Sequence, residues 1–376
     1  MNKQILFFAL LLQVASTQAQ AQTAPSQPSI SFHNWLSIAQ AGGAVLSPDG
    51  ANIAYTVTTT DWKENGYHTE IWLSRQNQPP FQLTHNSKSS SSLRWSPDSK
   101  WIAFLSDRGD KTQIYLISAE GGEAFPLTKE DEGISSFAWS PDGRQIAFIR
   151  PEADSKTFKN IKDRYGSFGE EGKDFKLSHL WLVRFSIDSL TDPVLQPDSN
   201  ALPTPTRLTS GNFTVTDLRW SPAGNGIAYN RQPDPYIPSS IHAAIDVLDP
   251  NTHKITTTIA DPAGDQLIAW SPDGNSLLYT SPLTDTTSNY YKNNRLFITP
   301  ISAPTPHEIA AGFDENKSVQ DWNPKGIFFI ALQHTRSALF HLDPATGEVN
   351  PVTTASDVIY NATFSKDGSQ MAWSGR

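Results

Sequence analysis

The sequence contains no cysteine, which excludes disulfide bonds, thiol catalysis and cysteine-ligated zinc or iron–sulfur sites. Basic residues are outnumbered, with 29 Lys and Arg against 38 Asp and Glu, and the net charge of −9 argues against a nucleic-acid partner. Gly and Pro, at 22 and 27 residues, stay near the usual share, which excludes collagen-like and low-complexity chains. Aromatic residues are plentiful, with 11 Trp, 19 Phe and 10 Tyr. The composition is that of an acidic, aromatic-rich globular protein.

Long apolar runs are missing except at the start of the chain. Lys3, the apolar stretch Ile5–Leu12 and the small-x-small sequence Ala19–Ala21 are typical of a secretory signal peptide over residues 1–21. A membrane anchor is the alternative, but the run is shorter than the roughly 20 apolar residues that span a bilayer. We expect an exported chain, periplasmic or secreted, with no membrane association after cleavage and with a leader over residues 22–35.

One short motif recurs along the rest of the chain. It consists of Trp, Leu or Phe followed by a turn of the Ser-Pro-Asp-Gly type, in which Pro presets φ, Asp accepts backbone N–H groups and Gly adopts positive φ. Most of the intervals between successive copies of the motif are close to the 40–50 residues expected of propeller blades, and one interval is nearly twice as long. The copies are Leu46–Gly50, Trp95–Ser99, Trp139–Gly143, Trp220–Gly224, Trp270–Gly274, Trp322–Gly326 and Phe364–Gly368.

Strands are expected at fixed offsets around each motif. The aromatic residue ends a first strand and is expected to point into the interface with the next blade. A second strand alternates large apolar residues with Ala, as in Ile102–Phe104, and a third is apolar, as in Ile114–Ile117. A fourth closes several blades at Gln82–Thr84, Pro126–Thr128, Arg207–Thr209 and Pro351–Thr353.

These strands, without helical periodicity, predict an all-β fold: a β-propeller over residues 36–376 with four-stranded blades and about seven repeats. A β-sandwich would not explain seven matched turns. The seventh copy has only its first two strands before Arg376, and half a blade leaves an unpaired edge. We therefore expect a chain truncated within its seventh blade.

The turn and the following Ile-Ala-Phe resemble the repeat of TolB-like propellers and of the propeller in prolyl oligopeptidase-family serine peptidases. The opening Leu36–Tyr55 and the long interval carrying Lys162–Gly166 and His179–Val183 are similar to acylaminoacyl-peptidase-like members. The resemblance implies a propeller that precedes an α/β-hydrolase domain with a Ser-Asp-His triad and that restricts substrates to short peptides. The sequence contains no G-x-S-x-G nucleophile elbow, so no catalytic residue is carried over and we expect the chain alone to be inactive.

Candidate substrate-binding residues lie in the long interval: Arg164, Tyr165, Glu170 and Glu171. In dipeptidyl-peptidase relatives a Glu pair binds the free amino terminus of the substrate, since carboxylates suit an ammonium group. The residues flanking Glu170–Glu171 do not match that motif, so a solvated loop is the favoured alternative for all four. His307–Glu308 does not extend to H-E-x-x-H, and we expect neither a metal nor a cofactor.

The leading hypothesis is therefore the substrate-gating propeller of an exported prolyl oligopeptidase-family serine peptidase. Its partners would be short peptides or a catalytic α/β-hydrolase domain. The alternative is a TolB-like periplasmic propeller that binds other proteins. A remnant without function is a third interpretation, suggested by the missing half-blade.

Overall fold

The computed structural model describes residues 30–154, 156–166, 175–191, 202–287, 292–353 and 358–375. Two compact units divide the chain, Met1–Ile38 and Ala39–Arg376. In the first unit, helix α1 (Phe32–Leu36) begins after Ser31, whose hydroxyl accepts a hydrogen bond from the Asn34 amide at 3.1 Å. The predicted signal peptide lies outside the described residues. Within the described part of the chain, no helix is long and apolar enough to cross a membrane.

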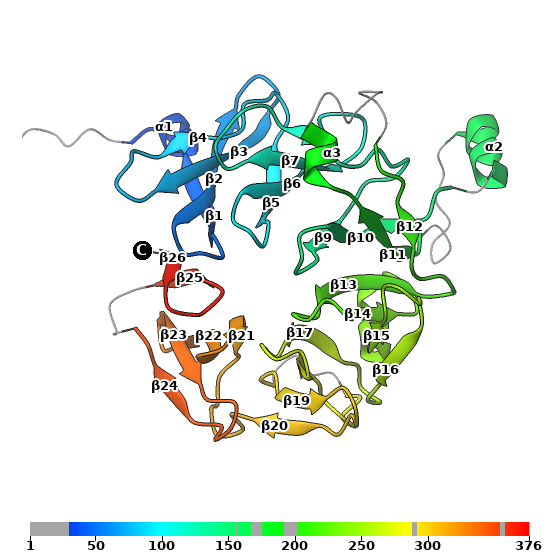
Figure 1. Ribbon diagram of the computed structural model, residues 1–376, viewed down its shortest axis with the longest axis vertical. Helices are drawn as coiled ribbons and strands as arrows, with labels where there is room; N and C mark the ends of the chain where they lie inside the picture. The colour runs from blue at the N-terminus through cyan, green and yellow to red at the C-terminus, as the bar shows by residue number, and fades with distance from the viewer. Residues whose placement is uncertain are drawn as a thin grey trace, which may run out of the picture. The chain divides into compact units, whose positions relative to one another are not determined.

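The second unit is built from antiparallel sheets in which consecutive strands are neighbours (Figure 1). Blade 1 contains β1 (Gln40–Leu46), β2 (Asn52–Asp61), β3 (Gly66–Arg75) and β4 (Phe81–Gln82). Blade 2 contains β5 (Ser90–Trp95), β6 (Trp101–Ser106), β7 (Gln113–Ser118) and β8 (Phe125–Pro126). Blade 3 contains β9 (Ser136–Trp139), β10 (Gln145–Pro151), β11 (Ser178–Arg184) and β12 (Thr206–Arg207).

Three further four-stranded sheets follow. Blade 4 contains β13 (Thr214–Trp220), β14 (Ile227–Gln232), β15 (Ala244–Leu248) and β16 (Ile255–Ile259). Blade 5 contains β17 (Gln266–Trp270), β18 (Ser276–Thr280), β19 (Leu296–Pro300) and β20 (His307–Ile309). Blade 6 contains β21 (Ser318–Asn323), β22 (Gly326–Gln333), β23 (Arg336–Leu342) and β24 (Val349–Pro351).

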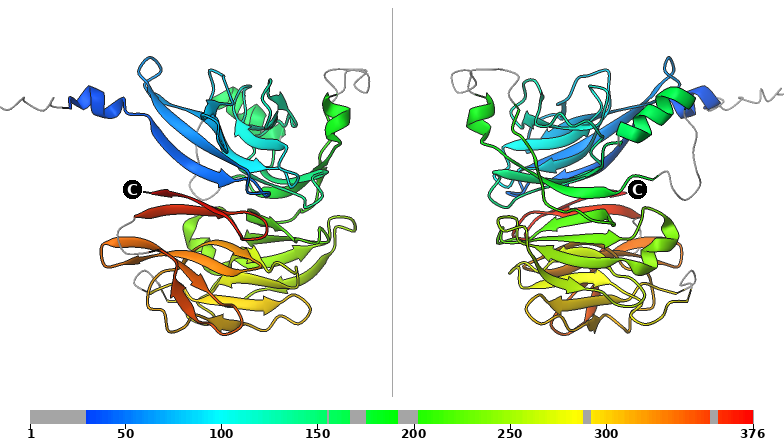
Figure 2. Two further views of the ribbon diagram at one scale, coloured as in Figure 1. Left: turned by 60° about the vertical axis from the view of Figure 1, so that its left-hand side comes forward. Right: turned by 90° about the vertical axis from the view of Figure 1, so that its right-hand side faces the viewer.

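The fold is an all-β propeller with six four-stranded blades, and the seventh copy of the motif forms a two-stranded sheet, β25 (Ile359–Phe364) and β26 (Met371–Gly375). The first strands of successive sheets contact one another, and β25 contacts both β21 and β1, so the first and last sheets meet. Figure 2 shows β25 and β26 between blades 1 and 6. Side chains hold this junction: Leu46 N donates to Thr363 Oγ1 at 3.0 Å and Asn361 Nδ2 donates to the Ala44 carbonyl at 3.1 Å.

The turns follow the chemistry that the sequence predicts. In the first copy, Asp49 Oδ1 accepts from Ser47 Oγ at 2.6 Å and from Ala51 N at 3.0 Å, and Gly50 has φ of 76°. Ser99, which replaces Gly in the second copy, also has positive φ, at 61°. Its hydroxyl accepts from Asp49 N at 3.1 Å, so consecutive turns are linked.

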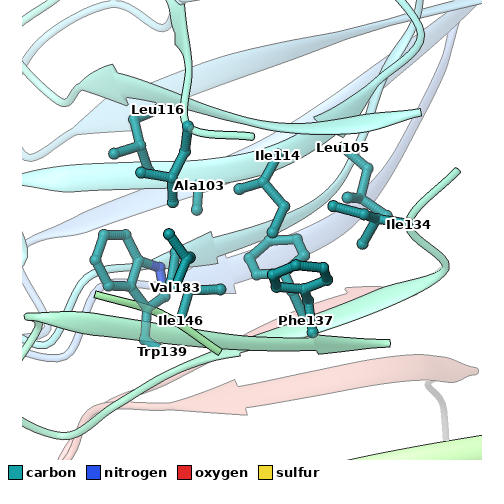
Figure 3. Packing of buried hydrophobic residues seen from close by; sticks show 11 residues of the cluster. Ala103, Leu105, Ile114, Leu116, Ile134, Phe137, Trp139, Ile146 and Val183 are labelled. Carbon is teal, nitrogen blue, oxygen red and sulfur yellow. The ribbon is translucent and has the colours of Figure 1, made fainter. Parts of the chain in front are cut away.

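The core lies between neighbouring sheets, and alternate residues of one strand serve different interfaces. In β6, Ile102 and Phe104 pack against blade 1, whereas Ala103 and Leu105 belong to the cluster shared with blade 3 (Figure 3). The expected direction of the motif aromatic is wrong, because Trp95 packs on the preceding blade. The register explains this: Trp95 pairs with Ile102, so both side chains share the sheet face that meets blade 1.

Two further expectations need correction. The long interval contains helix α2 (Lys156–Tyr165), which Figure 1 shows at the outer side of blade 3, and the shorter helix α3 (Ile187–Thr191), between β11 and β12. The 3-10 helix η1 (Ile237–His242) lies between β14 and β15. The fourth strands end earlier than predicted: β4 ends at Gln82, and Thr84 continues the contact through its side chain, with Oγ1 accepting from Ile71 N at 2.9 Å. In blades 4 and 5 the fourth strand is β16 and β20, and the sequence pattern predicts neither.

Candidate functional site

A pocket of about 740 Å³ lies between the connections of blades 4 and 5. On one side, η1 contributes Ile237, Pro238 and Ile241, and the Ile237 side chain is 88% exposed. The opposite side is polar and includes Ser281 and the segment Lys292–Arg295. A concave site that combines apolar side chains with a few polar groups is the usual form of a small-ligand pocket.

Two carboxyl groups adjoin this pocket, the buried Asp265 and the half-buried Asp261. Asp265 is 0% exposed, and its Oδ2 accepts from the backbone N–H of Asp261 at 2.8 Å. Burial, together with the neighbouring Asp261 charge, raises the pKa of Asp265 to about 7. Ser281 connects the pair to the pocket, because it lines the pocket and donates from Oγ to Asp261 Oδ2 at 3.2 Å. Burial also raises the pKa of Tyr279, whose hydroxyl has no partner among the described residues.

A second pocket, about 400 Å³, shares the segment Lys292–Arg295 with the first and extends toward blade 6. Arg295 on β19 forms an ion pair with Glu308 on β20, with Nε donating to Oε1 at 3.0 Å. Phe313 and Lys317, from the connection between β20 and β21, complete the wall. Neither pocket has a histidine among its described lining residues, so the arrangement supplies binding groups and no imidazole base.

The predicted site residues lie elsewhere. Arg164 and Tyr165 end helix α2, where both side chains are exposed and the Arg164 guanidinium lies 5.9 Å from the Tyr165 ring centroid. Glu170 and Glu171 lie outside the described residues. The pockets carry no sequence motif: Asp265 and Lys317 are single residues in connections between blades, which is why sequence reasoning missed them. Among the described residues, no three His, Asp or Glu side chains gather as a metal site.

The base of the long insertion is anchored by charged side chains. Lys176, at the end of the insertion, forms two ion pairs: its Nζ lies 2.8 Å from Glu132 Oε1 and 2.9 Å from Asp154 Oδ1. Glu152, at its start, bonds Arg207 at 2.6 Å. The start of the insertion is thus tied to β12 of blade 3 and its end to the connection between blades 2 and 3, which favours a defined position for both ends.

Comparison with known proteins gives matches along the chain. The TolB β-propeller (PD40) domain family matches residues 36–168. Dipeptidyl-peptidase 5 of Porphyromonas gingivalis is 25% identical over 339 residues, which cover 85% of this chain and 48% of that protein. The chain therefore spans about half the length of this curated relative.

Solved structures share the fold. The acylaminoacyl peptidase of Pyrococcus horikoshii superposes with a TM-score of 0.64 at 14% identity, covering 91% of this chain and 50% of that one. The propeller domain of the trilobed protease of Pyrococcus furiosus superposes with a TM-score of 0.55 at 16% identity, covering 85% of this chain and 88% of that one. Residues 36–168 thus match the TolB-like PD40 propeller family, and the resemblance of the chain to the propeller part of prolyl oligopeptidase-family peptidases is confirmed.

Proposed function

We propose that this chain is the substrate-gating propeller of an exported prolyl oligopeptidase-family serine peptidase that acts on short peptides. The observation that carries the proposal is the coverage: similarity extends over 85% of this chain but over 48% of the dipeptidyl-peptidase relative. A ring of sheets packed face to face is rigid, because interiors of proteins are close-packed, and a rigid scaffold beside a catalytic domain selects substrates by size. Its loops provide the contacts, and Arg164, Tyr165, Glu170 and Glu171 stay predicted substrate contacts.

The first test is the activity of the purified chain from residue 22 onward. Aminoacyl and peptidyl nitroanilides should remain intact, because catalysis would require a nucleophile elbow that these residues do not contain. Hydrolysis that a serine-directed inhibitor abolishes would contradict this part of the proposal. Fractionation of the native host should place the protein outside the cytoplasm, and a cytoplasmic location would contradict export.

The second test concerns gating and uses the complete gene product. The coding sequence after the codon for Arg376 should contain G-x-S-x-G followed by Asp and His. The complete product should cleave peptides of a few residues with a much higher kcat/KM than unfolded chains with the same cleavage site. Equal kcat/KM for both substrates would contradict gating. A stop codon together with a stoichiometric periplasmic partner would instead favour the TolB-like protein-binding alternative.

A further inference from the structure

The two carboxyl groups that adjoin the 740 Å³ pocket have no basic partner. The register of β17 with β18 continues past Gln266, so Asp265 lies opposite Ser281, and its carboxyl is within hydrogen-bonding reach of the Asp261 carboxyl. Ser281 Oγ donates to Asp261 Oδ2 at 3.2 Å. Neither carboxyl takes part in an ion pair with another described residue. Because adjoining carboxylates repel each other, this place favours a cation between them.

A tyrosine hydroxyl faces the same place. Tyr279 is 0% exposed, and its hydroxyl has no partner among the described residues. Side chains two residues apart on a strand share a face, so Tyr279 lies on the sheet face of Ser281 and of Asp265 opposite it. Burial, together with the charges of Asp261 and Asp265, raises the pKa of Tyr279. Asp265 Oδ1 is also buried without a partner. Buried polar atoms are normally bonded, so these two oxygens indicate a ligand.

Blade 4 has a basic side chain at the corresponding position. Tyr229 occupies in β14 the position that Tyr279 has in β18, and its hydroxyl donates to Asp246 Oδ2 at 3.2 Å. Arg231 Nε donates to the same oxygen at 2.6 Å, so a guanidinium neutralises this buried carboxylate. Blade 5 has Ser281 where blade 4 has Arg231. The positive charge that blade 4 supplies from its own chain is therefore missing in blade 5.

We propose that Asp261, Asp265 and the hydroxyls of Tyr279 and Ser281 bind a divalent cation of the calcium type. All the donors are oxygen atoms, which suit a hard cation, whereas zinc and copper favour nitrogen and sulfur. Two carboxylates balance two positive charges. Calcium takes about six to eight oxygen ligands in flexible geometry, so water from the adjoining pocket completes its shell, whereas magnesium demands a near-ideal octahedron and dehydrates reluctantly.

The cation and a proton are alternatives at this pair. Burial and the neighbouring Asp261 charge raise the pKa of Asp265 to about 7, so the metal-free pair lowers its repulsion by keeping a proton. Measurements of that proton therefore require metal-free buffer. Cation binding goes beyond the proposed function, since it belongs to the propeller whether or not a hydrolase domain accompanies it.

Calorimetry at pH 8 tests the site on the chain from residue 22 onward, freed of metal with a chelator and titrated with calcium chloride. D265N should weaken calcium binding at least about tenfold, because it removes one of the two charges. D131N is the matched control, since it removes the same charge at an exposed position, and it should bind calcium as wild type does. No calcium binding by wild type, or an equal Kd for D265N and D131N, would overturn the proposal.

Y279F shows whether the site is built as proposed, and it keeps the test open if D265N does not fold. The substitution removes only a hydroxyl without a partner, so Tm in metal-free buffer should stay near that of wild type. Calcium binding should weaken about threefold or more, whereas Y67F, at an exposed tyrosine, should not change it. An unchanged Kd for Y279F would overturn the proposal.

Two further measurements on wild type decide the class of cation. Calcium should bind at least about tenfold more tightly than magnesium and far more tightly than sodium, each added as its chloride. Calcium should also raise Tm with increasing concentration, because it binds the folded chain. Equal affinity for calcium and magnesium, or a Tm that does not depend on calcium, would overturn the proposal.

Discussion

The Trp95 indole N–H donates a hydrogen bond to the Val45 carbonyl at 3.0 Å, and this bond joins blade 2 to blade 1. The contact recurs around the propeller, with Trp139 Nε1 donating to the Arg94 carbonyl at 3.3 Å and Trp270 Nε1 donating to the Arg219 carbonyl at 3.1 Å. Trp220 occupies the same motif position, but its Nε1 has no partner among the described residues. The motif aromatic therefore both fills the interface and fixes the preceding first strand.

Replacement of Trp95 with Phe measures this bond. W95F should lower the free energy of unfolding by about 1 kcal/mol more than W220F, because both substitutions shrink a buried aromatic and only W95F removes a hydrogen bond. Urea unfolding followed by circular dichroism gives both values. Equal losses in the two variants would show that the Trp95 N–H contributes packing alone.

Asp265 makes the stability of the propeller depend on pH. Its pKa is raised to about 7, so between pH 4 and 7 the unfolded chain loses this proton while the folded chain keeps it. The contribution of Asp265 to stability therefore falls as the pH rises through this window and is constant above it.

The variant D265N replaces the protonated carboxyl with an amide that does not ionise. It should raise Tm on the order of 2–5 °C at pH 8 and leave Tm nearly unchanged at pH 4, while D131N, at an exposed position, should change neither value. Thermal unfolding at the two pH values tests this. A D265N variant that is less stable than wild type at pH 8 would show that the buried group is ionised.

Gly264 holds the wall of the larger pocket in a conformation that requires glycine. Its φ is +85°, and a Cβ at this position would lie 2.3 Å from the Ser240 carbonyl oxygen of η1. G143A provides the comparison: Gly143 also has positive φ, +70°, but the nearest atom to its Cβ would be 3.6 Å away. We expect G143A to lower the free energy of unfolding by about 1–2 kcal/mol and G264A to lower it by more, as measured by urea unfolding. Similar costs would mean that η1 shifts freely.

Thr84 connects the end of blade 1 to a buried carboxylate. Its Oγ1 accepts from Ile71 N at 2.9 Å and donates to Glu70, which is also bonded by Asn86 N at 2.8 Å. T84V should cost about 2–3 kcal/mol, because hydrogen bonds to charged groups contribute more than neutral ones. In blade 6, Thr353 accepts from Leu339 N at 3.1 Å, but Ala338 stands where blade 1 has Glu70, so T353V should cost about 1 kcal/mol. A smaller loss for T84V than for T353V would contradict this account.

The amino-acid sequence by itself determined the repeat and hence the propeller. The information is local, because Asp49 and Gly50 form their turn with residues that are close in the chain. Five consecutive residues are therefore enough to predict the turn. The alternation in Ile102–Phe104 likewise predicted a strand buried on both faces, and the structure confirms it. The seventh copy was found in the same way, although it forms a sheet of two strands.

Only the tertiary structure decided which groups meet. The register of β5 with β6 places Trp95 on blade 1 and not on blade 3, and helix α2 occupies an interval in which no helical pattern was recognised. Lys317 and Asp265 are buried, and nothing in the sequence around either residue distinguishes it from an exposed acid or base. Burial and charge pairing depend on residues far apart in the chain, so they follow from the packing of the blades and not from the motif.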